Sequence, residues 1–475
     1  MSIRERLGRR IGENRPGEFG YALVAVWVFA VFYTVLVYLR MFYLPDGDSL
    51  RRIWIALGFA AGAAAVLTAG ALWLLAIKRN SSSLLCFREL LRELVTPGFI
   101  ILAVWLVWAC VAWVLTVREG LSSLSHNSSY IFDMFVSLMV LFPMGCYMGK
   151  RGRFTLLNVL MDTGICLHAL LLMGGFLAMA LSADHTAVIF GRSFGYTLEH
   201  RLAMGAYVNT TGAYGAFFAM AAIYRLCAVK KPAAKVLYGL SILLFLYALV
   251  QSDSRASILS FAAFLFFLVF VLVTRRLKVL DSKAVRIVLL VIGVAALLCL
   301  IMFLMDGANS LPFRAVTAVM PRLFGSERAE TAAVLGGRTL LWDTIIQNIR
   351  SDPHLMTHGC SPATVIFHVF DLTGEQLYTH NQFLEVFLGQ GVPAVVMFTL
   401  WVCWLCRRCY GLAIQKNSEV NPGCWILPVI ILALLVCNMA EAMLVSLQHY
   451  IGSMFFLTAG YIGGLTDPEK KPVQS

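Results

Sequence analysis

Long apolar runs separated by short polar segments dominate this chain. An α-helix needs roughly 20 residues to cross a hydrocarbon core of about 30 Å, so each run of that length predicts a membrane-spanning helix. Such runs occur near residues 20–39, 53–77, 98–117, 130–149, 155–181, 202–224, 236–250, 256–274, 287–305, 383–406, 425–444 and 446–465. The pattern therefore predicts an all-α polytopic membrane protein with about twelve transmembrane helices.

Two pairs of spans are predicted to form hairpins because only a short polar turn separates them. The seventh and eighth spans are joined at Gln251-Ser252-Asp253, and the last two spans at Ser446–Tyr450. A polar turn at membrane depth is tolerated when protein buries it or a cavity wets it.

One long polar segment, punctuated by Pro and Gly, separates the ninth and tenth predicted spans. Within it, Leu341, Ile345 and Ile349 recur at helical spacing, and Ser351-Asp352-Pro353 ends the pattern. We therefore predict a large exterior loop domain that contains amphipathic helices. The predicted division is 1–305 for the membrane domain with helices 1–9, 306–382 for the extracytoplasmic loop, and 383–475 for helices 10–12 and a cytoplasmic tail.

The distribution of basic residues predicts the orientation. Every lysine, from Lys78 to Lys471, falls on one side of the predicted spans, together with the arginine-rich amino-terminal arm. Cytoplasmic loops retain an excess of Lys and Arg, so both termini are predicted to be cytoplasmic. Basic residues on the opposite side are all arginines, among them Arg201, Arg255 and Arg338. The first run follows a basic arm and lacks a small-residue cleavage pattern, which favours a span over a signal peptide.

Composition excludes an ordinary soluble domain, because 60% of the residues are hydrophobic, 13% are charged and the mean hydropathy is +0.79. The net charge of +12 comes mostly from residues that set the orientation. It therefore requires no nucleic-acid partner, and membrane lipids are the expected surroundings.

The twelve cysteines predict neither a disulfide framework nor a metal site. In the predicted topology Cys360 is the one cysteine of the large exterior loop, so that loop offers no pair. Cys403, Cys406 and Cys409 have a spacing that could hold a metal, but on a helix they form one face of small apolar residues with no histidine nearby. We therefore predict no metal and no cofactor.

Three residues predicted to lie on the exterior side can carry chemistry. Arg255 follows Ser254 at the turn into the eighth span, and Arg338 stands at the start of the loop helix. A helix N-terminus has unpaired N–H groups and a partial positive charge, so an arginine there favours an anion such as a diphosphate. His380, beside Asn381 at the mouth of the tenth span, can take and return a proton near neutral pH.

Structural roles remain open for the same residues. Arg255 can pair with Asp253, Arg338 can extend toward lipid headgroups, and His380 can cap a helix. Glu441, predicted near the outer end of the eleventh span, can pair with an exterior arginine or orient His380.

Four groups of residues together resemble a known family. They are Tyr207-Val208-Asn209-Thr210-Thr211-Gly212, Ser254-Arg255-Ala256, Gly337-Arg338 to Trp342 with Pro353 and Gly359, and His380-Asn381 with Gly391 and Pro393. In order, spacing and topology they resemble the bacterial O-antigen ligase and O-antigen polymerase (Wzy-type) family of membrane glycosyltransferases. Thr210 stands where that family often has proline, and Ala256 where it often has glycine.

The resemblance implies a multi-pass protein of the bacterial cytoplasmic (inner) membrane that serves polysaccharide and lipopolysaccharide biosynthesis in the cell envelope. Members transfer a glycan from an undecaprenyl diphosphate carrier to a hydroxyl of a glycolipid or glycan acceptor at the extracytoplasmic face, and the ligases require no metal. The implied roles are diphosphate binding by Arg255, Arg338 and Arg201, general-base catalysis of an inverting displacement by His380, and support from Asn381, Asn209, Ser254 and Glu441.

Two other functions stay open at this stage. A Wzy-type polymerase of lipid-linked repeats shares the same pattern, and a protein-glycosylating relative is a further variant. A transporter or lipid-linked glycan flippase also fits about twelve spans, although no two-fold repeat is evident and few acidic residues lie within the spans.

Overall fold

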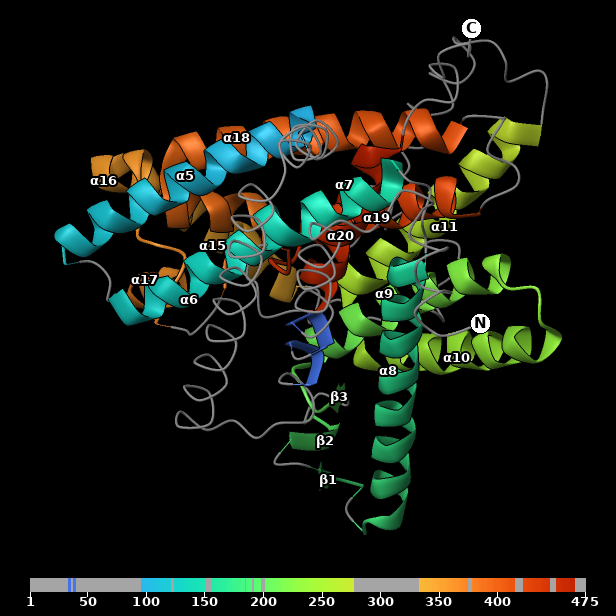
Figure 1. Cartoon of the computed structure of the whole chain (residues 1–475). Helices are drawn as coiled ribbons and strands as arrows, with labels where there is room; N and C mark the ends of the chain where they lie inside the picture. Colours follow the sequence, from blue (N-terminus) through green and yellow to red (C-terminus); the bar gives the residue numbers. More distant parts are fainter. Residues whose placement is uncertain are drawn as a thin grey trace, which may run out of the picture.

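The computed structural model describes residues 33–35, 37–39, 95–120, 124–150, 155–183, 185–189, 192–197, 201–276, 333–374, 378–414, 422–444 and 450–465. This part of the chain is mostly helical (Figure 1). The α-helices are α5 (Pro97–Arg118), α6 (Leu124–Phe135), α7 (Phe142–Lys150), α8 (Thr155–Leu181), α9 (Val208–Ala228), α10 (Pro232–Ser252), α11 (Arg255–Arg276), α15 (Ala333–Ser351), α16 (Pro353–Thr357), α17 (Val365–Thr373), α18 (Gln382–Ile414), α19 (Ile426–Cys437) and α20 (Tyr450–Gly464).

The described residues also contain a π-helix, a 3-10 helix and three short strands. A π-helix, η1 (Val136–Leu141), joins α6 to α7, and a 3-10 helix, η5 (Pro422–Cys424), precedes α19. The strands β1 (Ala187–Ile189), β2 (Arg192–Tyr196) and β3 (Leu202–Met204) form an antiparallel sheet in the order β1-β2-β3.

Six described helical segments are long and apolar enough to cross a membrane, and they begin at Pro97, Tyr130, Leu157, Pro232, Arg255 and Gln382. All six coincide with predicted spans, which confirms a helical multi-pass membrane protein. The predicted spans at 53–77 and 287–305 lie outside the described residues, as does most of the span at 20–39. The total of twelve therefore remains a prediction.

Two predicted spans have different boundaries in the structure. The span predicted at 202–224 begins with β3, and its helix α9 starts at Val208. The helix predicted at 425–444 ends at Cys437, because Asn438 turns the chain and its side chain accepts from the N–H groups of Met443 and Leu444. The turn predicted at 446–450 lies outside the described residues, apart from Tyr450 at the start of α20.

Small residues allow α7 and α20 to pack backbone against backbone. Gly145 and Gly149 of α7 lie against carbonyl oxygens of α20, and Gly460 and Gly464 of α20 lie against carbonyl oxygens of α7. An added Cβ at each position would approach the facing oxygen to about 2 Å, since the distances are 2.1, 2.1, 2.0 and 2.0 Å. Apolar side chains gain little from association in lipid, so this close approach is what joins the two helices.

The predicted loop helix and its apolar stripe are both present. Leu341, Ile345 and Ile349 of α15 are buried in one cluster with Val365 of α17 and Leu388 of α18. The helix ends at Ser351, and α16 follows with Asp352 as its N-cap residue. Figure 1 shows α15, α16 and α17 gathered at one end of α5 and α18. The division of the chain at 305 and 382 remains a prediction.

A kink in α18 docks this loop onto the membrane helices. Gly391 has φ +75° and ψ −175° within α18, and Pro393 has no N–H to donate to the carbonyl of Gly389. The carbonyls of Leu388 and Gly389 instead accept from the N–H groups of Cys360 and Ser361 at 2.8 and 3.0 Å. The backbone N–H groups of the loop thus satisfy carbonyls that the kink leaves without a partner inside the helix.

Segments assigned to the same side by the charge pattern contact each other. On the predicted exterior side, Glu119 after α5 contacts His358 of the loop. On the predicted cytoplasmic side, Arg225 at the end of α9 pairs with Asp162 of α8 at 2.6 Å. These contacts indicate that the predicted exterior segments lie at the same end of the helices. The charge pattern predicts that this end faces outside the cytoplasm.

Candidate active site

The site is centred on His380, which precedes α18 with a left-handed backbone, φ +52°. Asn381 holds the entry to the helix, since its side-chain oxygen accepts from the N–H groups of Phe383 and Leu384 at 2.9 and 3.2 Å. Its amide group donates to the carbonyl of Met439 at 3.1 Å. Asn381 is therefore the N-cap residue of α18.

Thr379 fixes the other side of the histidine. Its hydroxyl donates to Glu385 Oε2 at 2.7 Å, and its carbonyl accepts from the indole N–H of Trp342 at 2.8 Å. Trp342 belongs to α15 and Glu385 to the first turn of α18. The loop domain and the membrane helix therefore both hold the backbone of His380 in place.

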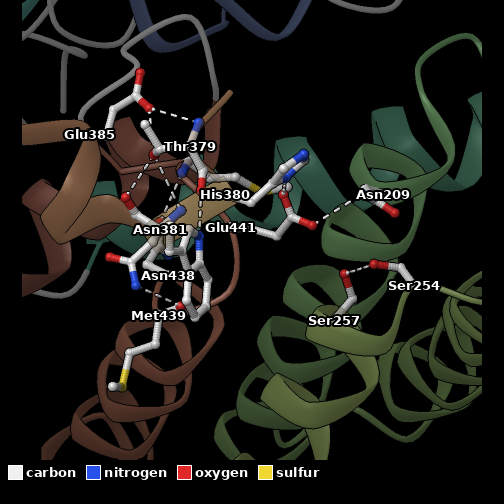
Figure 2. Close-up of polar contacts among 12 residues, drawn as sticks. Asn209, Ser254, Ser257, Thr379, His380, Asn381, Glu385, Asn438, Met439 and Glu441 are labelled. Atoms are coloured by element: carbon white, nitrogen blue, oxygen red, sulfur yellow. Dashed lines mark hydrogen bonds and ion pairs between the residues drawn. The ribbon is translucent and has the colours of Figure 1, made fainter. Parts of the chain in front are cut away.

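A carboxylate contacts the imidazole directly. His380 Nδ1 lies 3.0 Å from Glu441 Oε2, and the Glu441 side chain is 7% exposed against 19% for His380. The second carboxylate oxygen, Oε1, accepts from the amide of Asn209 at 3.0 Å. Figure 2 shows Glu441 between His380 on one side and Asn209 of α9 on the other.

The segment after α19 is folded so that Glu441 reaches this position. The side-chain oxygen of Asn438 accepts from Met443 and Leu444 at 2.9 and 3.1 Å. The carbonyl of Asn438 accepts from the N–H of Gln382 at 2.9 Å, and the Gln382 side chain accepts from Leu444 at 2.9 Å. Glu441 was expected inside the eleventh span, and that placement is wrong: it lies in this irregular segment, and it is 5% exposed.

Arg201 extends the polar chain to the α10–α11 turn. Its guanidinium donates to Asn209 Oδ1 at 2.9 Å and to the carbonyl of Ser252 at 3.2 Å, with a longer contact of 3.4 Å to the carbonyl of Asp253. Continuous hydrogen bonds therefore run from His380 through Glu441 and Asn209 to the turn that precedes Arg255. Arg201 therefore stabilises this series of hydrogen bonds and also contributes positive charge to the site.

Arg255 stands at the first position of α11, directly after the turn. Within the described residues its guanidinium has no hydrogen bond or ion pair, and the Asp253 pairing considered from the sequence is not formed. Ser254 is held instead by Ser257, whose hydroxyl lies 2.8 Å from its own. Gly212 of α9 permits the turn to approach, because a Cβ there would lie 2.5 Å from Ser254 Cβ.

The structure thus brings together five of the predicted site residues, His380, Asn381, Glu441, Asn209 and Arg201, and places Ser254 and Arg255 beside them. Arg338 lies in the first turns of α15, where the side chains fall outside the description. Sequence analysis missed Thr379 as a hydrogen-bonding residue, together with Glu385, Asn438 and Gln382. The position of Glu385 in the first turn of a helix, six residues after Thr379, was a usable signal, whereas the role of Asn438 required the fold.

This arrangement is suited to proton transfer. A carboxylate at Nδ1 orients the imidazole, favours the tautomer with the proton on Nδ1 and stabilises the imidazolium once it forms. The second nitrogen, Nε2, has no protein hydrogen bond within the described residues and keeps its lone pair for a substrate proton. The guanidinium of Arg255, which is unpaired within the described residues, can hold an anion, and guanidinium suits phosphate oxygens.

Helical multi-pass architecture and a histidine–carboxylate pair beside arginines define a membrane protein with an enzyme-like site. Residues 240–399 match the family model described as O-Antigen ligase, so this part of the chain is similar to the O-antigen ligase family. This match confirms the resemblance drawn from the sequence motifs. It includes Arg255, Arg338 and His380, whereas Asn209 and Glu441 lie outside it. No curated protein matches the chain closely enough to count as a relative.

Proposed function

We propose that this protein transfers a glycan from an undecaprenyl diphosphate carrier to an acceptor hydroxyl at the extracytoplasmic face of a bacterial inner membrane. The family match supports ligase-like or polymerase-like chemistry in general. The observation that carries the mechanism is the 3.0 Å contact between His380 Nδ1 and Glu441, which leaves Nε2 available as a base.

In the proposed step the acceptor oxygen attacks the anomeric carbon of the donor sugar. The new oxygen–carbon bond forms as the bond from that carbon to the diphosphate oxygen breaks, and the electron pair leaves with the carrier diphosphate. The hydroxyl proton passes to His380 Nε2, a contribution of roughly 10²- to 10⁴-fold in rate. A single displacement of this kind inverts the anomeric centre.

Arginines offset the negative charge that develops on the leaving diphosphate. Arg255 is the principal candidate because its guanidinium is free within the described residues, and it stands at a helix N-terminus that adds its own partial positive charge. Arg338 is proposed from its sequence position, and Arg201 contributes charge from within the hydrogen-bonded chain. Two charges develop in the transition state, a positive charge on the His380 imidazole and a negative charge on the leaving diphosphate. Glu441 stabilises the first, and the arginines stabilise the second.

The test uses the purified chain, a defined undecaprenyl diphosphate glycan and candidate acceptors. Transfer of the glycan to a new acceptor supports a ligase, and elongation of the carrier-linked glycan supports a polymerase. Movement of the carrier across the bilayer without new glycosidic bonds would contradict both and favour a flippase or transporter.

Variants at His380 test the proposed base. His380→Ala and His380→Gln should both lose nearly all turnover while carrier binding survives, because glutamine keeps a hydrogen bond but accepts no proton. A His380→Gln variant with normal turnover would mean that the histidine only positions the acceptor.

A further inference from the structure

A second cluster of ionisable side chains joins the end of α5 to the loop domain. His354 Nδ1 lies 3.2 Å from Glu119 Oε1, and His358 Nε2 lies 2.8 Å from Glu119 Oε2. All three ligand-type atoms lie within 4.8 Å of one another. Within the described residues the cluster shares no residue or hydrogen bond with the His380 site, and the sequence pattern indicated no role for it.

These atoms have the identity and spacing of a metal-ion site. Zinc is bound by imidazole nitrogens and carboxylate oxygens at about 2.0–2.2 Å, so neighbouring ligand atoms around a tetrahedral ion are roughly 3.3 Å apart. The His354–Glu119 separation of 3.2 Å is close to that value, and the His358–Glu119 separation of 2.8 Å is shorter, as expected for a hydrogen-bonded pair before an ion enters. His354 and His358 stand four residues apart, which places two histidines on one side of a helical turn.

The surroundings of His358 favour a cation at its Nε2 atom. Its Nδ1 atom lies 3.0 Å from the hydroxyl of Thr357, which itself lies 2.9 and 3.1 Å from the carbonyls of Pro353 and His354. Carbonyls only accept, so the single hydroxyl proton is directed to them and the imidazole donates from Nδ1. With Nδ1 donating to Thr357, the lone pair of His358 Nε2 can bind a metal ion that the Glu119 carboxylate also binds. A ligand histidine whose other nitrogen donates a hydrogen bond is the usual arrangement at metal sites.

The backbone that carries the two histidines is held rigidly. Asp352 Oδ1 accepts from the N–H of His354 at 2.8 Å, and a Cβ added at Gly391 would lie 2.7 Å from the N–H nitrogen of His358. His358 is buried, with a side chain 5% exposed, whereas that of His354 is 60% exposed. The exposed side leaves room for water as a fourth ligand.

We propose that Glu119, His354 and His358 bind a divalent transition-metal ion of the zinc type, which ties α16 of the loop domain to the end of α5. Imidazole with one carboxylate suits zinc or copper and disfavours magnesium, which prefers oxygen ligands and retains its water. The site lies apart from His380, so the proposal is independent of the transfer reaction and of any requirement for metal in it.

The full-length chain, purified in detergent and stripped with a chelator, is equilibrated with zinc, desalted and analysed for metal content. Zinc should be retained in amounts equal to the protein, and cobalt in its place should give the visible absorption of a four-coordinate site. Magnesium should not be retained. Loss of both signals is expected in Glu119→Gln and in His354→Gln, and the exposed position of His354 makes the second variant safe for folding.

His185→Asn is the matched control, because it removes a histidine from the same predicted side and asparagine tolerates the left-handed backbone there, φ +53°. It should retain zinc as the parent does. Zinc should also raise the unfolding temperature of the parent and of His185→Asn, and leave that of His354→Gln unchanged. Absence of retained zinc in the parent, or equal retention in His354→Gln, would overturn the proposal and leave these groups as a hydrogen-bonded ion pair.

Discussion

At the residue scale, the central feature is a histidine whose two ring nitrogens have different surroundings. Nδ1 of His380 faces Glu441 at 3.0 Å, and Glu441 in turn accepts from Asn209 at 3.0 Å. The carboxylate thus has a donor for each oxygen and is held in one orientation. A buried carboxylate with both oxygens occupied is a positioning group for the imidazole, and this role can be separated experimentally from that of a base.

Glu441→Gln should lower turnover by about 10- to 100-fold, less than the loss expected for His380→Ala. Glutamine offers one acceptor and one donor, so it cannot accept from both His380 and Asn209. Loss of the negative charge also destabilises the imidazolium that forms in the transition state, so kcat should fall while the KM values for donor and acceptor change little. The measurement is kcat and KM of transfer, with Asp371→Asn, an exposed carboxylate of α17, as the control. An unchanged kcat in Glu441→Gln would contradict the positioning role.

Arg255 is expected to bind the donor diphosphate. Arg255→Ala should reduce transfer by about 10²- to 10³-fold, the usual cost of removing one donor from developing negative charge. Arg255→Lys should recover little of this, since a point charge does not reproduce the planar fork of guanidinium. Arg350→Ala, at the exposed end of α15, is the matched control and should transfer normally. Normal transfer by Arg255→Ala at normal expression would refute the assignment.

At the element scale, the kink in α18 decides how the loop domain meets the membrane helices. Gly391 and Gly359 both have positive φ, +75° and +76°, and each lies against backbone of the other segment. A Cβ on Gly391 would lie 2.3 Å from the carbonyl oxygen of Thr357, and a Cβ on Gly359 would lie 2.4 Å from the N–H nitrogen of Gln390. Two glycines that the family motifs contain therefore form one contact between the loop and the helix.

Gly391→Ala should destabilise the protein by at least about 1–3 kcal/mol, the cost of a strained backbone for a residue with a side chain, before the clash with Thr357 is counted. Gly411→Ala in the same helix is the matched control, because nothing lies within 4 Å of its would-be Cβ. Alanine there should leave stability unchanged or raise it by up to about 1 kcal/mol. Thermal unfolding in detergent measures both variants, and equal unfolding temperatures would contradict the docking role of the kink.

At the scale of the whole molecule, the predicted orientation places the loop helices and the site outside the cytoplasm. The structure distinguishes buried from accessible labelling positions in the loop. Ser361, beside Cys360, is 1% exposed and has φ +81°, so a cysteine there would be inaccessible. Asp371 in α17 is exposed and suits an impermeant thiol reagent.

Asp371→Cys should react with an impermeant maleimide added to intact cells. The native thiol of Cys360 should contribute little background, because burial raises its pKa to about 12 and the reactive thiolate is scarce. The parent chain, with Asp371 intact, serves as the control. Labelling of Asp371→Cys only after the membrane is opened would reverse the orientation and exclude an extracytoplasmic site.

The sequence predicted much of the fold because helical membrane spans depend on length and hydropathy. The spans that correspond to α5, α8, α10 and α11 were predicted to within a few residues. The same rule failed at 202–204 and after Cys437, where apolar residues continue although the backbone leaves the helix. Hydropathy reports burial in an apolar medium and does not distinguish a helix from a short strand or an irregular segment packed inside protein.

The sequence by itself determined the class of protein, the family resemblance and the candidate residues Arg255 and His380, because these depend on local composition and on order along the chain. Only the tertiary structure decided that Glu441 contacts His380, that Asn209 and Arg201 link them to the α10–α11 turn, and that Glu119 meets His354 and His358. Most of these contacts join residues far apart in sequence, and backbone turns at Asn438, Gly391 and Gly359 help to set their geometry. Such turns satisfy hydrogen bonds across elements, and periodicity along one segment carries no information about them.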